Sequence, residues 1–344
     1  MTSNDPPGLA LGTLRACLDE RLPGLVGGEL TGEVVQGGRS NLTYVVSDGA
    51  NRWVVRRPPL GHVLPTAHDM KREHRVITGL GPTAMPVPET LLLCEDPDVL
   101  GAPFYVMEFV EGTPYRTADE LVPLGAERTR AIAHSLVDTL VALHEVEPDS
   151  VGLGDFGRPE GFLERQLRRW KKQLDGSRNR DLPGADALHD RLAAAIPASG
   201  RPSIIHGDYR LDNVLVDGAD GTDRITAVLD WEMSTLGDPL TDLALMVAYA
   251  ERSALNLDFV SNATTAPGYP SPDEVVARYA GRSGRDVSAL NWYVGFAFFK
   301  LAVILEGIYF RFTKGQTVGE GFERAGDGVI PLIRHGNEIL KEDR

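Results

Sequence analysis

Three polar side chains that could bind a metal ion and a phosphate group stand around two short apolar strands. Asp208 ends the motif His-Gly-Asp, and Asn213 follows it by five residues. Asp230 ends the second strand, after a loop rich in Asp and Gly. Two strands joined by so short a polar loop predict an antiparallel hairpin, which would bring Asn213 next to Asp230. Two hard oxygen ligands with a free carboxylate suit Mg²⁺, a phosphate group and a base for a hydroxyl.

Each of these residues also has an ordinary structural interpretation. A single Asp before a strand is more often a turn cap than a catalytic group. The coincidence of Asp208, Asn213 and Asp230 favours a nucleotide and metal site instead. We predict that Asp208 orients the acceptor hydroxyl and receives its proton, while Asn213 and Asp230 hold Mg²⁺ between phosphates. His206 is expected to be structural, with its ring bonded to nearby backbone.

The motifs resemble those of a known superfamily. The spacing of Asp208, Asn213 and Asp230 is similar to that of the protein-kinase-like catalytic core. His-Gly-Asp, Asp-Trp-Glu and the run at residues 237–244 resemble the aminoglycoside phosphotransferase and choline kinase branch. The nearest resemblance is to the phosphotransferase modules that are fused to acyl-CoA dehydrogenases in animals. It covers nearly the whole chain and implies a bilobal α+β fold, ATP and Mg²⁺ as cofactors, and an alcohol group as phosphate acceptor.

A glycine-containing turn between two expected strands is the candidate phosphate loop. Gly37 and Gly38 permit positive φ and a close approach of the backbone, and Ser40 and Asn41 can donate hydrogen bonds to phosphate. The turn matches neither Gly-x-Gly-x-x-Gly nor the Walker A pattern. An ordinary hairpin turn is therefore an equal alternative.

The resemblance also implies a Lys on the third strand, which reaches the phosphates and pairs with a helix Glu. Arg56 and Arg57 stand there instead, and only one can face the nucleotide because side chains alternate along a strand. We predict Arg56 for this role and Glu73 as its partner, with a solvent-facing Glu73 as the alternative. Arg can bridge phosphates, but its geometry differs from that of Lys. This departure suggests a second interpretation, a nucleotide-binding pseudokinase.

The strand before residue 111 is implied to contact the nucleotide base. Backbone groups of Glu108 and Val110 would bond the adenine edge, and Met107 would lie at the back of the pocket. The sequence does not separate ATP from GTP as donor.

The composition restricts the partners and the compartment. A formal charge of −14, from 35 Lys and Arg against 49 Asp and Glu, disfavours nucleic acid and anionic membranes. Cys17 and Cys94 form no disulfide or zinc pattern, and the N-terminus lacks signal-peptide features, so we expect a cytoplasmic protein. The apolar segment 292–312 is interrupted by Lys300 and Glu306, which favours a buried helix over a membrane span. The oligomeric state is not indicated.

The apolar pattern divides the chain into two parts. Residues 1–111 are predicted as a nucleotide-binding lobe with helices at 11–22 and 69–80 and strands at 33–36, 42–46, 53–57, 90–94 and 103–110. Residues 112–344 are predicted as a mainly helical lobe that binds the acceptor, with helices at 125–144, 162–174, 239–250, 272–280, 289–312 and 322–340. We expect Asp238 and Asp242 to brace the catalytic loop and cap the helix after it.

The acceptor is predicted from two of these helices. Segment 292–312 is rich in aromatic residues and holds one carboxylate, Glu306. Helix 162–174 carries five basic residues: Arg165, Arg168, Arg169, Lys171 and Lys172. Both features favour a partly apolar hydroxylated acyl compound, and the resemblance implies a hydroxyacyl-CoA. An aminoglycoside is the alternative acceptor, and the basic run is otherwise a solvated helix face.

Overall fold

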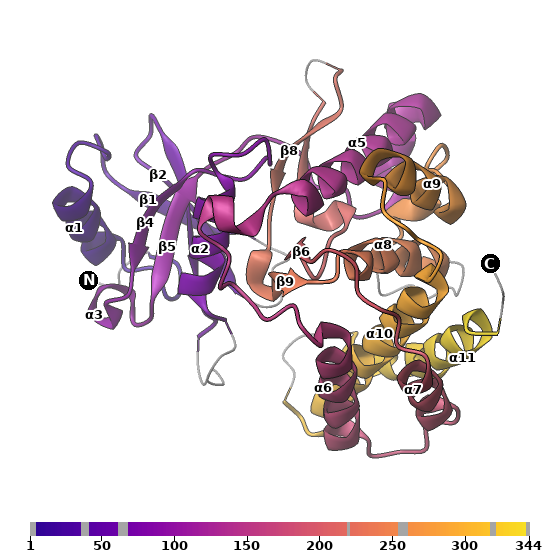
Figure 1. The fold of residues 1–344 in the computed structure, drawn as a ribbon. Coiled ribbons are helices and arrows are strands. Elements are labelled where there is room, and N and C mark those ends of the chain that lie inside the picture. Colours follow the sequence, from indigo (N-terminus) through magenta and orange to yellow (C-terminus); the bar gives the residue numbers. More distant parts are fainter. Residues whose placement is uncertain are drawn as a thin grey trace. The chain divides into compact units, whose positions relative to one another are not determined.

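The computed structural model describes residues 5–35, 41–60, 68–218, 221–253, 261–316 and 321–341. The chain forms two compact units, whose elements are labelled in Figure 1. The sheet unit comprises Met1–Gly112 with Thr226–Ser234, and the helical unit comprises Thr113–Ile225 with Thr235–Arg344. Segment Thr226–Ser234 lies in the sheet unit because Val228 N–H donates to the Pro86 carbonyl (2.7 Å) and Arg72 donates to the Ser234 carbonyl (3.2 Å). Asp230 is therefore part of the sheet unit, whereas the sequence pattern grouped it with residues 112–344.

The sheet unit is built on a five-stranded antiparallel sheet in the order β1-β2-β3-β5-β4. Its strands are β1 (Thr31–Val34), β2 (Leu42–Ser47), β3 (Arg52–Arg57), β4 (Thr90–Cys94) and β5 (Phe104–Glu108). The predicted meander of the first three strands is confirmed. Alternation along β5 directs Phe104 and Val106 to one face of the sheet and Tyr105 to the other.

A helix covers each face of this sheet. Helix α1 (Leu11–Arg21) buries Leu14 and Leu18 in one core with Phe104 and Val106. Helix α2 (Met70–Leu80) packs against β4 and β5, and its His74 ring lies 6.0 Å from the ring of Tyr105. The short helix α3 (Pro97–Leu100) joins β4 to β5. The sheet thus has two buried faces, and α2 covers the face that carries the polar site.

The helical unit is organised around its longest helix, α10. Its helices are α4 (Ala118–Leu121), α5 (Gly125–Glu145), α6 (Phe162–Ser177), α7 (Ala185–Ala194), α8 (Leu240–Ser253), α9 (Pro272–Ser283), α10 (Leu290–Thr313) and α11 (Val329–Ile339). Helix α10 packs against α6, α7, α8 and α11. The predicted final helix is corrected, since Phe322–Gly328 forms a 3₁₀ helix before α11. The Tyr309 ring packs onto Gly326, where a Cβ would lie 2.7 Å from it.

Helix α10 is long and apolar enough to cross a membrane by length and composition alone. However, 67% of its apolar window is buried inside the protein, as expected for a core helix. Two of its charged residues, Lys300 and Glu306, are also buried. Glu306 is paired with Arg180 at 2.7 Å, and Lys300 donates to the Gly207 carbonyl at 2.7 Å.

Two small sheets flank the segment that holds Asp208. Strand β6 (Ser203–Ile205) pairs antiparallel with β9 (Thr235–Gly237). Strand β7 (Val214–Asp217) pairs with β8 (Arg224–Val228), as the hairpin pattern predicts. Asp208 lies between β6 and β7, so both ends of its loop are tied to strands.

Candidate active site

The loop that carries Asp208 is fixed by a buried carboxylate. Asp242, in the first turn of α8, accepts hydrogen bonds from the backbone N–H groups of His206 (2.7 Å) and Gly207 (2.8 Å). Its side chain is 0% exposed, and His144 Nε2 lies 3.3 Å from Oδ2. Burial opposes ionisation, but the hydrogen bonds of His144 and His206 outweigh it and lower the pKa of Asp242. The predicted bracing by Asp242 is confirmed.

His144 completes this buried arrangement as a neutral ring. Burial lowers the pKa of His144 despite the carboxylate beside it. Its Nε2–H therefore donates to Asp242, and its Nδ1, 2.8 Å from the Tyr279 hydroxyl, accepts. Asp238 has a parallel role, since it accepts from Leu240 N–H (3.1 Å) at the start of α8 and from the Tyr293 hydroxyl (2.8 Å). The capping role predicted for Asp238 is confirmed.

Asp242→Asn is expected to lower the free energy of unfolding by about 1–3 kcal/mol, because one amide oxygen replaces two acceptors and leaves a buried N–H unsatisfied. Urea denaturation of the variant and the wild type measures this difference. Asp181→Asn is the matched control, since the Asp181 side chain is 89% exposed. Equal stability of the two variants would contradict the bracing role.

Asp208 itself is oriented by three side chains. Its side chain is 25% exposed. Oδ1 accepts from the Tyr249 hydroxyl (2.5 Å), Oδ2 accepts from Asn213 Nδ2 (3.1 Å), and Arg210 Nε lies 3.5 Å from Oδ2. The backbone N–H of Asp208 donates to His206 Nδ1 (3.2 Å), so the His206 ring bonds nearby backbone as predicted. The carboxylate is thus held in one orientation while part of it stays open to a ligand.

Asn213 lies at the end of a short 3₁₀ helix, Leu211–Asn213, and is mostly buried. Its Nδ2 donates to the backbone carbonyl of Asp208 (2.9 Å) as well as to the Asp208 carboxylate. The amide nitrogen is thereby committed to Asp208. The Oδ1 atom of Asn213 remains as the group that could bind a cation.

Asp230, in the sheet unit, has an uncommon backbone conformation. Its φ is +65°, in the left-handed region that few residues other than Gly adopt. The chain is fixed directly after it by Trp231, whose indole Nε1 donates to the Val228 carbonyl (2.9 Å). Its carboxylate is 30% exposed and forms an ion pair with Arg56. Such conformations persist only when the surroundings impose them, and they cluster at functional sites.

Arg56 joins Asp230 to the helix carboxylate predicted for it. Arg56 Nε lies 2.9 Å from Glu73 Oε1, and the Glu73 side chain is 1% exposed. Arg57 lies on the other face of β3, where it donates to the carbonyls of Gly8 (2.8 Å) and Leu100 (2.5 Å). The predicted pairing of Arg56 with Glu73 is present, and the solvent-facing alternative for Glu73 is wrong. A role for Arg56 in binding phosphate remains a prediction.

Of the Arg56–Glu73 pair, Glu73 is the member whose protonation changes within a pH range where stability can be measured. Burial raises the pKa of Glu73 to about 7, although Arg56 opposes this shift. Burial alone would lower the pKa of Arg56, but Glu73, Tyr105 and Asp230 outweigh it and raise that pKa. The guanidinium therefore stays charged, while Glu73 changes its charge near neutral pH.

Stability should consequently fall as pH rises from about 4.5, the ordinary pKa of Glu73, to about 7. In this range the folded state keeps a proton that the unfolded state has lost. At about 1.4 kcal/mol per pKa unit, the loss is at most about 3.5 kcal/mol. Glu73→Gln is expected to remove this slope, as measured by urea denaturation at several pH values across the range. An identical slope in the variant would show that Glu73 is not its source.

The other residues predicted to bind the nucleotide belong to the glycine-containing turn at residues 37–41 and to the end of β5. Gly37, Gly38 and Ser40 lie outside the described residues. Asn41 is buried, its Nδ2 donates to Glu232 (3.1 Å), and its Oδ1 lies 2.7 Å from His68 Nδ1. The amide that was predicted to meet phosphate is therefore engaged by side chains of the sheet unit.

The end of β5 was predicted to meet the base. Met107 is buried there, and Val110 is half-buried just beyond the strand. Glu108 N–H donates to the Glu89 carbonyl (2.9 Å), and Glu89 N–H donates to the Glu108 carboxylate (2.8 Å). The backbone N–H of Glu108 is thus engaged within the sheet unit, and base binding by Glu108 and Val110 remains a prediction.

The described ranges contain no group of three or more His, Cys, Asp and Glu side chains that could hold a metal ion by itself. A carboxylate and an amide oxygen are donors of the kind that Mg²⁺ takes, because Mg²⁺ keeps several waters and shares phosphate oxygens. A joint role of Asn213 and Asp230 as its ligands remains a prediction. Asp230 would have to exchange its ion pair with Arg56 for the cation.

Tyr249 was missed by the sequence analysis. It follows Asp242 by seven residues, two turns along α8, so both side chains reach the same loop from one helix face. That spacing is a signal that could have identified it. Lys300 was considered only as a charge in an apolar helix, whereas it bonds the backbone next to Asp208.

Known proteins are similar to this chain over most of its length. Residues 31–277 match the phosphotransferase enzyme family. Acyl-CoA dehydrogenase family member 11 of Rattus norvegicus is 35% identical over 337 residues, which are 96% of this chain and 43% of that protein. The chain therefore spans less than half the length of this relative.

Solved structures of other proteins have the same fold as this chain. A Ralstonia eutropha protein described as a candidate aminoglycoside phosphotransferase has a TM-score of 0.83 and 32% identity, covering 96% of this chain and 98% of that one. An aminoglycoside phosphotransferase in a ternary complex with AMP-PNP and hygromycin B has a TM-score of 0.60 and 16% identity, covering 96% and 98% of the chains, and shares the fold. The predicted kinase-like α+β fold is confirmed. Since the family match runs from β1 into α9 and includes Arg56, Asp208, Asn213 and Asp230, the chain belongs to the phosphotransferase enzyme family.

Proposed function

We propose that this protein transfers the γ-phosphate of ATP, in the presence of Mg²⁺, to a hydroxyl group of a small molecule. The observation that carries the proposal is the Asp208 carboxylate, which is partly exposed and oriented by Tyr249 and Asn213. A carboxylate so held can accept the proton of a hydroxyl that approaches it. The hydroxyl oxygen forms the new bond to phosphorus, the bond from phosphorus to the ADP oxygen breaks, and ADP leaves.

The other predicted residues have supporting roles in this proposal. Asn213 and Asp230 would hold Mg²⁺, which when bound neutralises charge on the phosphates. Arg56 would bind phosphate oxygens, kept in place by Glu73. The AMP-PNP complex of an aminoglycoside phosphotransferase with the same fold supports nucleotide use, although that complex is of the other protein.

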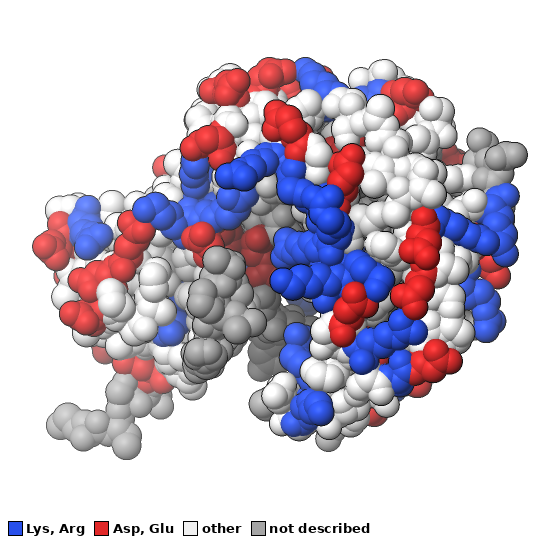
Figure 2. Space-filling view, turned by 60° about the horizontal axis from the view of Figure 1, so that its bottom comes forward, with Lys and Arg blue, Asp and Glu red and all other residues white. Residues whose placement is uncertain are grey.

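A hydroxylated acyl compound, such as a hydroxyacyl-CoA, is the acceptor that we propose. The similarity to acyl-CoA dehydrogenase family member 11 supports an acyl acceptor. Arg168, Arg169 and Lys172 of α6 are exposed, and Figure 2 shows a group of Lys and Arg side chains on one face of the protein. Such a face attracts anionic compounds and repels polycations.

An aminoglycoside is the second candidate acceptor, favoured by the similarity to the Ralstonia eutropha protein. A polycationic sugar needs carboxylates around it. Glu306, the one carboxylate of segment 292–312, is 0% exposed and paired with Arg180. It is therefore not available to such a ligand.

A nucleotide-binding pseudokinase is a candidate from another class. The ion pair between Arg56 and Asp230 favours it, because it occupies a carboxylate that the metal would need. From Cys17 and Cys94, which fit no disulfide framework, we also propose that the protein acts in the cytoplasm. From the net charge of −14 we propose that it has no nucleic acid or membrane partners.

A screen of ADP release tests these alternatives. Hydroxyacyl-CoAs of several chain lengths and the corresponding free hydroxy acids are compared with a panel of aminoglycosides. Turnover of an acyl compound supports the proposal. Phosphorylation of an aminoglycoside, with none of any acyl compound, would overturn the proposed acceptor. ATP binding without turnover of any acceptor would favour the pseudokinase.

A further inference from the structure

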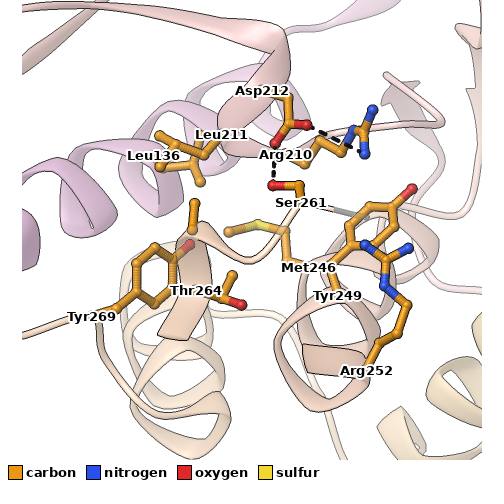
Figure 3. A pocket seen from close by; sticks show the side chains of 11 residues that line it. Leu136, Arg210, Leu211, Asp212, Met246, Tyr249, Arg252, Ser261, Thr264 and Tyr269 are labelled. Carbon is orange, nitrogen blue, oxygen red and sulfur yellow. Dashed lines mark hydrogen bonds and ion pairs between the residues drawn. The ribbon is translucent and has the colours of Figure 1, made fainter. Parts of the chain in front are cut away.

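A small pocket of the helical unit lies next to the loop that carries Asp208 (Figure 3). Apolar side chains of α5, α8 and the segment before α9 form one part of its wall: Leu136, Met246 and Tyr269. Its polar lining includes Arg210, Asp212 and Ser261. The cavity volume is about 30 Å³, so it admits a small group such as a carboxylate.

Arg252 of α8 also lines this pocket and is more deeply buried than Arg128 and Arg180 of the same unit, whose side chains are 36% and 29% exposed. It is 4% exposed, and its guanidinium carbon lies 4.7 Å from the centre of the Tyr249 ring. Arg128 and Arg180 each form an ion pair with a buried carboxylate. Within the ranges that the structure describes, Arg252 has neither an ion pair nor a hydrogen bond. A buried charge without a partner is unfavourable, and an arginine cannot relieve it by losing its proton.

The carboxylates close to Arg252 are bonded to other groups. Asp212 accepts from the Ser261 hydroxyl (2.8 Å), and its other oxygen lies 3.5 Å from Arg210 Nη1. Asp208 is bonded to Tyr249 and Asn213. The pocket lining thus carries two guanidinium groups and one carboxylate, an excess of one positive charge.

We propose that this pocket is an acceptor subsite in which Arg252 binds a carboxylate of the molecule whose hydroxyl meets Asp208. Tyr249 connects the two positions, because its ring contacts Arg252 and its hydroxyl bonds Asp208. The inference rests on the proposed phosphotransferase function and narrows its acceptor. Among the hydroxylated acyl compounds proposed above, the subsite favours the short free hydroxycarboxylic acids over the hydroxyacyl-CoAs, since a thioester or an amide offers Arg252 no negative charge. A phosphorylated alcohol would offer Arg252 the same kind of negative charge, carried by the larger phosphate group.

Binding of matched probes tests the subsite without requiring turnover. 4-Hydroxybutyrate, its uncharged amide and glycerol 3-phosphate are titrated into the protein by calorimetry with ADP and Mg²⁺ at saturation. We expect the wild type to bind the acid at least about tenfold more tightly than the amide, as one charge-assisted contact allows. Arg252→Gln should remove this preference, and Arg252→Lys should keep part of it. Arg282→Gln, at an arginine that is 59% exposed, is the control and should keep all of it.

Thermal stability separates a binding role from a structural one. Because Arg252 is a buried charge with no ion pair or side-chain hydrogen bond among the described residues, Arg252→Gln is expected to keep or raise the melting temperature. A lower melting temperature, with the preference for the acid unchanged, would show that Arg252 only supports the fold. Tight binding of glycerol 3-phosphate but not of the acid would assign the subsite to a phosphate group instead of a carboxylate.

The binding and ADP-release measurements distinguish a wrong subsite proposal from a wrong phosphotransferase proposal. A wild type that binds neither anion, or an Arg252→Gln variant that keeps the preference, would overturn the subsite. Loss of acid binding in Arg252→Gln, with no ADP release by the wild type for any acceptor, would uphold an anion site and contradict the phosphotransferase. ADP release with equal activity on acid and amide in both proteins would contradict the subsite alone.

Discussion

Asp208→Asn is expected to lower the rate of phosphate transfer by about 10²–10⁴-fold, because an amide cannot accept the proton of the acceptor hydroxyl. The substitution keeps the size of the side chain, and Tyr249 and Asn213 remain beside it. Nucleotide affinity should stay unchanged, since the role proposed for Asp208 concerns the acceptor.

Steady-state ADP release gives the rate, and calorimetry with ADP gives the affinity. Asp181→Asn, at an exposed position, is the control for the loss of one carboxylate. A variant with the rate of the wild type would remove Asp208 from the reaction. A variant that loses rate and nucleotide affinity together would point to damage of the fold.

Asp230→Ala is expected to abolish the dependence of nucleotide affinity on Mg²⁺. Loss of a group that only orients a metal ligand typically costs 10–100-fold in metal affinity, so loss of the ligand itself should cost at least about 100-fold. Asn213→Ala should lower the metal affinity less than Asp230→Ala does, because it removes a neutral oxygen and no formal charge. Asp230→Ala also removes the partner of Arg56, which should then be free to bind phosphate without the metal.

Nucleotide affinity measured across a titration of Mg²⁺ in the wild type and both variants tests this order. If wild-type affinity is the same with and without Mg²⁺, the assignment of Asn213 and Asp230 as metal ligands is wrong. If Asn213→Ala lowers the Mg²⁺-dependent nucleotide affinity more than Asp230→Ala does, the Asn213 amide acts through the Asp208 loop to which it is bonded.

Most of the sheet unit follows from its local sequence pattern. Val54, Val55 and Arg56 in β3 alternate between two faces, and turns with Gly or Pro separate the strands. The same alternation determines that Arg56 and not Arg57 meets Glu73. Helix α7 was missed because only Ala185, Leu188 and Leu192 are buried, too few to give a clear helical period. The break before α11 was missed because Gly326 packs against a distant ring.

The candidate site was predictable where its residues are close in sequence. Asp208 and Asn213 lie five residues apart on one loop, and their hydrogen bond follows from that spacing. Tyr249 could have been found from its spacing of two turns after Asp242 on α8. Arg252 gains its significance from a pocket that it lines together with residues of other elements, which no local pattern encodes. Segment Thr226–Ser234 belongs to the sheet unit through bonds to Pro86 and Arg72, residues far away in the chain. Tertiary contacts of this kind can be found only in the folded structure.

The most direct test follows the labelled γ-phosphate of ATP in the wild-type protein with Mg²⁺ and a set of short hydroxy acids. The phosphotransferase proposal predicts that the label appears on the hydroxyl of the acid, in equal amount to the ADP formed, and that Asp208→Asn prevents its transfer. Label found only in inorganic phosphate, or ATP bound with no label released in the presence of any acceptor, would contradict it.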